Sequence, residues 1–425
     1  MVFGAFPLPP RPRLRQRETR TEVPLVAMWG GLDDALGVSV KPKAPPPAST
    51  PANEGTAVPE PPRRREPFNL FGGLAFFGGL DGALGVSVAK PRTEDAADRP
   101  RPTPVPLRST YTPGRVDRDA HETKDSLPPL VVLVHGLESH GGTWDDLVAR
   151  FVASERPSPS FLAVDLRGHG LSPVGDEASF TPGALAADVA ACVEAHNREG
   201  RKVVLVGHSM GARVAARLCA DFPGVVSRLV IEDMDARVFD GTKYFGEAWG
   251  MTGFDYERAR AFKRTDDSLQ AMTASLTHAA GVGTFTKDRV DGYVVRGRVF
   301  ASSNGGRAVS LIQPLGFCLA FDRVLACDDM QDALSKIAAM PLRSQPEIHL
   351  WRAPEKCGES CASLAPGVAG GVEWILKRFS ERGVHDCVFP GAGHSVHKDT
   401  IELFERALRE LAFHGTPAAF EREAS

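Results

Sequence analysis

A serine flanked by glycines stands where a strand pattern changes directly into a helix pattern. Residues 202–206, K-V-V-L-V, are typical of a strand buried on both faces, and the residues after Gly211 have apolar side chains at helical spacing. Between the two, Gly207, Ser209 and Gly211 form a G-x-S-x-G pattern. A sharp turn from strand to helix requires small residues around the corner. We therefore predict a nucleophile elbow that holds the Ser209 hydroxyl above the sheet.

The G-x-S-x-G pattern alone is a weak signal, because glycine and serine are common residues. The alternative is a glycine-rich turn with a structural serine, and the flanking strand and helix favour the catalytic interpretation. At the start of that helix the backbone N–H of Met210 would lie in partial positive charge, which stabilises a developing oxyanion.

A second buried-strand pattern, Leu130 to Val134, runs into His135, Gly136 and Leu137. In hydrolases with a serine elbow, the loop after this upstream strand supplies the other half of the oxyanion hole. The backbone N–H of Leu137 is therefore our candidate for the second oxyanion-hole donor.

A general base for the serine is expected at the same edge of the sheet. His394 follows the last strand pattern, residues 386–390, in the glycine-flanked loop G-A-G-H. Two other histidines are interpreted as structural: His169, which would order the loop D-L-R-G-H-G-L-S, and His397, a neighbour of His394.

The acid that would orient the histidine has several candidates. Asp233 closes the strand pattern over residues 228–234, which would deliver it beside the elbow strand. Asp235 lies two residues further on, and Glu355 and Glu359 follow the next strand. Asp233 is our choice, and the other three remain open as alternatives.

Strand and helix patterns alternate along this part of the chain, which predicts an α/β fold with a mostly parallel, doubly wound sheet. The alternation stops over about residues 236–345, where charged helical segments predict a helical cap. The strands are expected over residues 130–134, 161–164, 202–206, 228–234, 347–351 and 386–390, and helices over 145–151, 182–195, 256–263, 266–278 and 400–413.

The N-terminal third differs in composition, since 21 of the 34 prolines precede residue 129. We predict a disordered Pro/Arg-rich arm over residues 1–126 and a hydrolase domain over 127–425. The arm contains a duplicated segment, G-G-L-D-x-A-L-G-V-S-V, at residues 30–40 and 78–88, for which no partner can be deduced.

Composition narrows the functional classes. A net charge of −3 with 24% charged residues gives no reason to expect a nucleic-acid partner, and no apolar run reaches the length of a transmembrane helix. The seven scattered cysteines favour an intracellular, reducing compartment. The arginine-rich start resembles an organelle transit segment, so mitochondrion and plastid stand as alternatives to an arm without targeting function.

Taken together, the motifs H-G, D-L-R-G-H-G-L-S, G-H-S-M-G and G-A-G-H-x-V-H resemble those of the α/β-hydrolase superfamily. Within it, the sequence is similar to small bacterial acyl-ester and acyl-CoA esterases of the YbfF type and their mitochondrial animal relatives, over about residues 127–414. The resemblance implies a roughly eight-stranded sheet with a helical cap. It also implies the following roles: nucleophile for Ser209, general base for His394, acid for Asp233, and oxyanion-hole amides for Leu137 and Met210.

We therefore expect a serine hydrolase that cleaves a small-molecule carboxylic ester or thioester through an acyl-enzyme intermediate, without a cofactor. Hydrolysis of an amide or a carbon–carbon bond by the same triad is one alternative. A ligand-binding protein of this fold without turnover is the other.

Overall fold

The computed structural model describes residues 103–115, 127–239, 253–302, 307–354, 362, 367–381 and 383–415. Most of the predicted arm, with its duplicated segment and transit-like start, lies outside these residues. Glu355 and Glu359 lie outside them as well. What was predicted for these parts of the chain stays a prediction.

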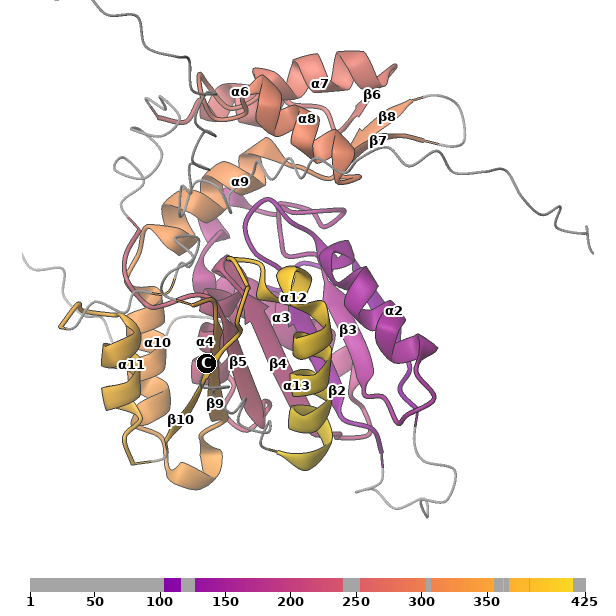
Figure 1. The fold of residues 1–425 in the computed structure, drawn as a ribbon. Coiled ribbons are helices and arrows are strands. Elements are labelled where there is room, and N and C mark those ends of the chain that lie inside the picture. The colour runs from indigo at the N-terminus through magenta and orange to yellow at the C-terminus, as the bar shows by residue number, and fades with distance from the viewer. Residues whose placement is uncertain are drawn as a thin grey trace, which may run out of the picture.

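Seven strands of the described residues form one central sheet in the order β1-β3-β2-β4-β5-β9-β10 (Figure 1). Every neighbouring pair is parallel except β1 with β3. The predicted mostly parallel sheet is confirmed, with seven described strands where the resemblance implied about eight. The strands are β1 Ser109–Thr112, β2 Leu130–Val134, β3 Ser160–Val164, β4 Val203–His208, β5 Arg228–Glu232, β9 Glu347–Arg352 and β10 Val384–Val388.

The order of the strands reverses beside β2. The chain passes from β2 outward to β3 and then returns to the other side of β2 as β4. In open α/β sheets, such a switch point leaves a crevice at the carboxyl ends of the strands, where ligands bind. The loops after β2 and β4 meet there.

Both faces of the sheet are covered, which explains why its strands are apolar without alternation. Val132 and Leu205 face a layer formed by α3 (Pro182–His196), α4 (Met210–Asp221) and α10 (Asp329–Ala338). Val131 and Val206 face α2 (Asp145–Ala153) and α13 (Ile401–His414) on the other side. Shorter helices are α11 Val372–Arg378, α12 Val396–Asp399, the 3-10 turns Gly141–Trp144, Glu177–Ser179 and Leu342–Ser344, and a π-helical turn, Phe321–Leu325.

A cap lies over the carboxyl edge of the sheet (Figure 1). Unlike the prediction, it is not purely helical, because it contains a small antiparallel sheet in the order β6-β8-β7. Its elements are α6 Tyr256–Ala261, β6 Thr265–Asp266, α7 Leu269–Thr277, α8 Lys287–Val295, β7 Val299–Ala301, β8 Ala308–Ser310 and α9 Pro314–Ala320. None of the described helices is long and apolar enough to cross a bilayer.

The predicted end of the cap at residue 345 is also too late. Helix α10 packs beside α4 and α11 in the core layer. The reason is its sequence: Met330, Ala333, Leu334 and Ile337 are spaced three and four residues apart and are all buried. This apolar stripe returns the chain to the face of the sheet.

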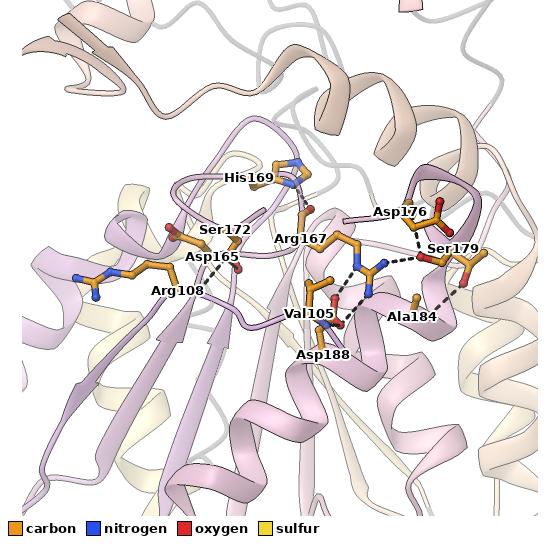
Figure 2. A network of polar contacts seen from close by, with 11 residues as sticks. Val105, Arg108, Asp165, Arg167, His169, Ser172, Asp176, Ser179, Ala184 and Asp188 are labelled. Carbon is orange, nitrogen blue, oxygen red and sulfur yellow. Dashed lines mark hydrogen bonds and ion pairs between the residues drawn. The ribbon is translucent and has the colours of Figure 1, made fainter. Parts of the chain in front are cut away.

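The predicted domain boundary at residue 126 is wrong, because the described residues before it belong to the sheet. Strand β1 pairs antiparallel with β3. Just ahead of β1, the Val105 N–H donates to Asp188 Oδ1 at 2.7 Å and the Arg108 N–H donates to Ser172 Oγ at 2.8 Å (Figure 2). The sequence S-T-Y-T lacks an apolar run because β1 is a half-exposed edge strand.

A buried ion pair fixes the loop after β3 to helix α3 (Figure 2). Arg167 donates from Nε to Asp188 Oδ2 at 2.7 Å and from Nη2 to Oδ1 at 2.8 Å. The side chains are only 1% and 0% exposed. Burial raises the pKa of Asp188, and the hydrogen bonds from Arg167 and from the Val105 N–H oppose that rise. Loss of Asp188 would therefore leave a buried positive charge, because an arginine side chain does not give up its proton in a protein.

We predict that Asp188→Asn lowers the free energy of unfolding by about 3–5 kcal/mol, because it leaves the Arg167 guanidinium buried without a counter-charge. Chemical denaturation measures this value. As a matched control, Lys336→Met removes a half-exposed ion pair with Asp332 and costs less than about 1 kcal/mol. Equal losses in the two variants would contradict the role given to the buried pair.

Candidate active site

The corner between β4 and α4 is the most constrained point of the candidate site. Ser209 has φ 52° and ψ −122°, a left-handed conformation that is strained for a residue with a side chain. A Cβ on Gly211 would lie 2.5 Å from the carbonyl oxygen of Val134, and one on Gly207 would lie 2.6 Å from Cα of Ala212. Both glycines are therefore required where the G-x-S-x-G pattern places them.

Ser209 itself is 1% exposed, and its N–H donates to the carbonyl of Glu232 at 3.0 Å. Its Oγ has no hydrogen-bond partner in the described part of the chain. A buried hydroxyl without a partner costs free energy, so such a group requires an explanation.

Asp233 and His394 form a buried contact beside this corner. Their Oδ2 and Nδ1 atoms are 2.9 Å apart, and the side chains are 0% and 1% exposed. The second carboxylate oxygen of Asp233 accepts from the Ala353 N–H at 3.1 Å. Because His208 and Glu232 are register partners, Ser209 and Asp233 follow neighbouring strands at the same edge.

The structure thus places Asp233, the preferred acid, against His394, the predicted base. The alternative acid Asp235 pairs with an arginine. Asp235 is buried, and its Oδ2 accepts from Arg237 Nε at 2.7 Å. The loop of His394 is held against the elbow strand, since His208 Nε2 lies 3.0 Å from the His394 carbonyl oxygen.

Further polar side chains lie behind this pair and support it. Of these, only His397 is singled out from the sequence alone. Glu232 Oε1 accepts from the His397 N–H at 2.9 Å and lies 2.7 Å from His397 Nδ1. Burial raises the pKa of Glu232 to about 7. The signal for Glu232 was a charged residue that directly follows the apolar run of residues 229–231.

The atoms of His208, Glu232 and His397 lie close enough together to hold a metal ion. However, the Glu232 oxygen nearest His397 and the Nε2 of His208 already have hydrogen-bonding contacts. We interpret these three residues as a hydrogen-bonded support of the His394 loop.

The two predicted oxyanion-hole residues flank the serine. Leu137 follows β2 and Met210 begins α4, and both side chains are buried. Among the loop hydrogen bonds of the described residues, neither backbone N–H is used. A Cβ on Gly136 would lie 3.1 Å from Ser209 Cβ, so this glycine lets the backbone approach the serine closely.

His135 holds that loop in place rather than taking part in acid–base chemistry. Its Nε2 accepts from the Leu166 N–H at 3.0 Å, which leaves the proton on Nδ1, 2.7 Å from the carbonyl oxygen of Gly136. Burial is the main cause that lowers the pKa of His135 well below its usual value, so the ring is neutral.

The cap is tied to the loop after β2 by buried charges that sequence reasoning missed. Glu138, which follows Leu137, is 2% exposed and has φ 58°. Its carboxylate contacts Arg289 and the Tyr293 hydroxyl, both on α8. Arg289 also donates to the carbonyl of Thr284 at 2.7 Å. Only the tertiary fold reveals this pairing, because nothing in the local pattern links the two segments.

The cap also contacts the D-L-R-G-H-G-L-S loop. Gln313 Nε2 donates to the carbonyls of Gly170 at 2.9 Å and Ser172 at 2.8 Å. His169, expected to order this loop, is buried with its Nδ1 3.1 Å from the carbonyl oxygen of Arg167. The floor of the cap is therefore joined to the edge of the sheet through the loops after β2 and β3.

Comparison with known proteins identifies the family of this chain. The model of the family described as "Alpha/beta hydrolase family" matches residues 131–407, and the chain belongs to this family. The resemblance noted in the sequence is thereby confirmed.

Several curated proteins are similar to parts of the chain. Lipase LipV of Mycobacterium tuberculosis is 35% identical over 128 residues, 30% of this chain and 45% of LipV. The sn-1-specific diacylglycerol lipase ABHD11 of Mus musculus is 31% identical over 154 residues, 34% of this chain and 48% of that lipase. The chain thus matches less than half the length of either lipase.

A 2-(acetamidomethylene)succinate hydrolase of Mesorhizobium japonicum is 27% identical over 205 residues, 42% of this chain and 70% of that enzyme. Among solved structures, a marine microorganism esterase aligns over 72% of this chain and 99% of its own, with a TM-score of 0.49 and 15% identity.

We predict that Arg289→Met lowers the free energy of unfolding by about 3–5 kcal/mol, because the Glu138 carboxylate stays buried without its cation. The double variant Glu138→Gln/Arg289→Met should recover part of this loss, which a double-mutant cycle by chemical denaturation measures. Arg307→Met is the control, since Arg307 is 64% exposed and 4.0 Å from Asp267. Additive losses in the cycle would show that the two side chains do not depend on each other.

Proposed function

We propose that this protein is a serine hydrolase that cleaves a carboxylic ester or thioester through an acyl-enzyme intermediate. The observation that carries the proposal is the buried contact between Asp233 and His394 at the sheet edge where Ser209 is held in a strained corner. A nucleophile, a histidine and a carboxylate at one edge of a sheet are the components of acyl transfer by a serine triad.

In this proposal Asp233 fixes the tautomer of His394. The Ala353 N–H holds one carboxylate oxygen, and the other lies against Nδ1, which must then carry the proton. In this tautomer Nε2 carries the lone pair that takes the Ser209 proton. The unpartnered Oγ is explained as a nucleophile that acquires its hydrogen bond when the substrate is bound.

Ser209 Oγ attacks the acyl carbon, and the carbonyl oxygen becomes an oxyanion that the N–H groups of Leu137 and Met210 stabilise. His394 passes its proton to the leaving alcohol or thiol, which completes the acyl-enzyme. A water molecule, deprotonated by the same histidine, then releases the acid and restores the serine.

We choose an ester or thioester as the substrate because of the names of the relatives. Hydrolysis of an amide or of a carbon–carbon bond is the alternative. LipV and the diacylglycerol lipase are named as lipases, which supports an ester. The similar 2-(acetamidomethylene)succinate hydrolase is named for a substrate with an acetamido group, which keeps amide cleavage in the comparison. A panel of p-nitrophenyl esters, matching thioesters and anilides should show turnover of esters or thioesters before the others.

We predict that Ser209→Ala abolishes both hydrolysis of an activated ester and labelling by a fluorophosphonate probe. Loss of a triad nucleophile typically costs about 10⁴-fold or more in rate. The variant should keep its melting temperature, because it removes a hydroxyl without a partner. Wild-type protein that neither labels nor turns over any ester would instead support a binding protein of this fold.

The acid is tested by four single changes: Asp233→Asn, Asp235→Asn, Glu355→Gln and Glu359→Gln. We expect the first to lower kcat by about 10⁴-fold, because an amide cannot hold the histidine tautomer or stabilise the imidazolium. The other three should stay within about tenfold of the wild type. Our assignment is wrong if Asp233→Asn keeps most of its rate while one of the glutamate variants loses it.

A further inference from the structure

Three polar side chains meet at the amino ends of β9 and β10, the edge opposite Ser209. His349 and His385 are register partners on these neighbouring strands, and Glu347 lies two residues before His349, on the same face of β9. The two imidazole rings stack, with centroids 4.6 Å apart and an angle of 14° between their planes. Glu347 Oε1 lies 3.1 Å from His385 Nε2 and 3.5 Å from His349 Nε2.

The His349 ring is unusual for a buried imidazole. The residue is 0% exposed, yet neither of its ring nitrogens has a hydrogen-bond partner among the described residues. A buried polar group without a partner is costly, and an ion or water that belongs there is a common reason.

We propose that Glu347, His349 and His385 form a binding site for a divalent transition metal ion, with Zn²⁺ as the best match. Zinc takes histidine nitrogen and carboxylate oxygen at about 2.0–2.2 Å in tetrahedral geometry, which separates its ligand atoms by about 3.3 Å. The two distances to Glu347 Oε1, 3.1 and 3.5 Å, lie on either side of that value. The two rings are nearly parallel, so they must turn toward each other for both Nε2 lone pairs to reach one ion. A water molecule would take the fourth position.

Arg228 orients the Glu347 carboxylate for metal binding. It is the register partner of Glu347 on β5, and its Nε donates to Oε2 at 3.0 Å. Oε1 is left toward the two imidazoles. Such an outer contact orients a metal-ligating carboxylate.

The ion would join the last two strands of the sheet. Strand β10 is the edge strand, and it leads into the loop that carries His394. Because the site lies at the far edge from Ser209, we expect it to stabilise the fold and to take no part in hydrolysis. The inference therefore stands apart from the proposed function, and an inactive protein could still bind zinc here.

The test is a titration of the full-length chain, freed of metal by a chelator, with Zn²⁺ alone. Calorimetry should detect one zinc ion per chain, and binding should raise the melting temperature. We expect His385→Asn to lower the affinity for zinc. The loss should exceed the roughly 10–100-fold that removal of an outer-shell partner costs. This ring is 40% exposed, so the variant should fold.

The matched control is His278→Asn, which removes an exposed histidine from the cap and should bind zinc like the wild type. A second readout is the electron paramagnetic resonance spectrum of the Cu²⁺-loaded chain, since copper binds the same donors more tightly. It should show splitting from two nitrogens in the wild type and fewer in His385→Asn. Zinc affinity or a copper spectrum unchanged by His385→Asn would overturn the proposal.

Discussion

The turn at Ser209 is the constraint on which the rest of the site depends. A buried strand becomes a helix within one residue, and the backbone conformation of Ser209 is one that side chains rarely adopt. Packing on all sides holds it there. The chain passes so close at Gly136, Gly207 and Gly211 that a methyl group at any of them would strike its neighbours. The strain is tolerated because strand β4 and helix α4 are buried in the middle of the fold.

Parallel register explains why distant residues meet at this turn. Strands β2, β4 and β5 lie side by side, so Leu137, Ser209 and Asp233 leave the sheet at the same level. His394 follows β10, two strands beyond β5, and must cross that distance in a loop. The loop is fixed by the Asp399 carboxylate, which accepts from the Gly393 N–H at 2.9 Å, and by the contact with His208.

The cap uses a different kind of attachment. Glu138 is surrounded by low-dielectric protein, where its contacts with Arg289 and Tyr293 are strong and their loss is expensive. Because Glu138 follows Leu137 directly, the same contacts position the backbone proposed to stabilise the oxyanion. The charge pair therefore links the cap to the loop after β2. Ion pairs and hydrogen bonds have preferred directions, so they fix this loop more narrowly than an apolar contact of the same size would.

The local patterns of the sequence determined the strand-to-helix corner, most strands and helices, and the loop of His394. They could do so because apolar periodicity and the need for glycine are properties of short segments. Only the tertiary structure decided that the Asp233 carboxylate contacts His394, since the direction of a carboxylate depends on which strands are neighbours. It also revealed the polar edge strand Ser109–Thr112 and the contact between Glu138 and Tyr293, which are 155 positions apart. Such pairings leave no periodic signal, because each partner alone looks like an ordinary surface residue.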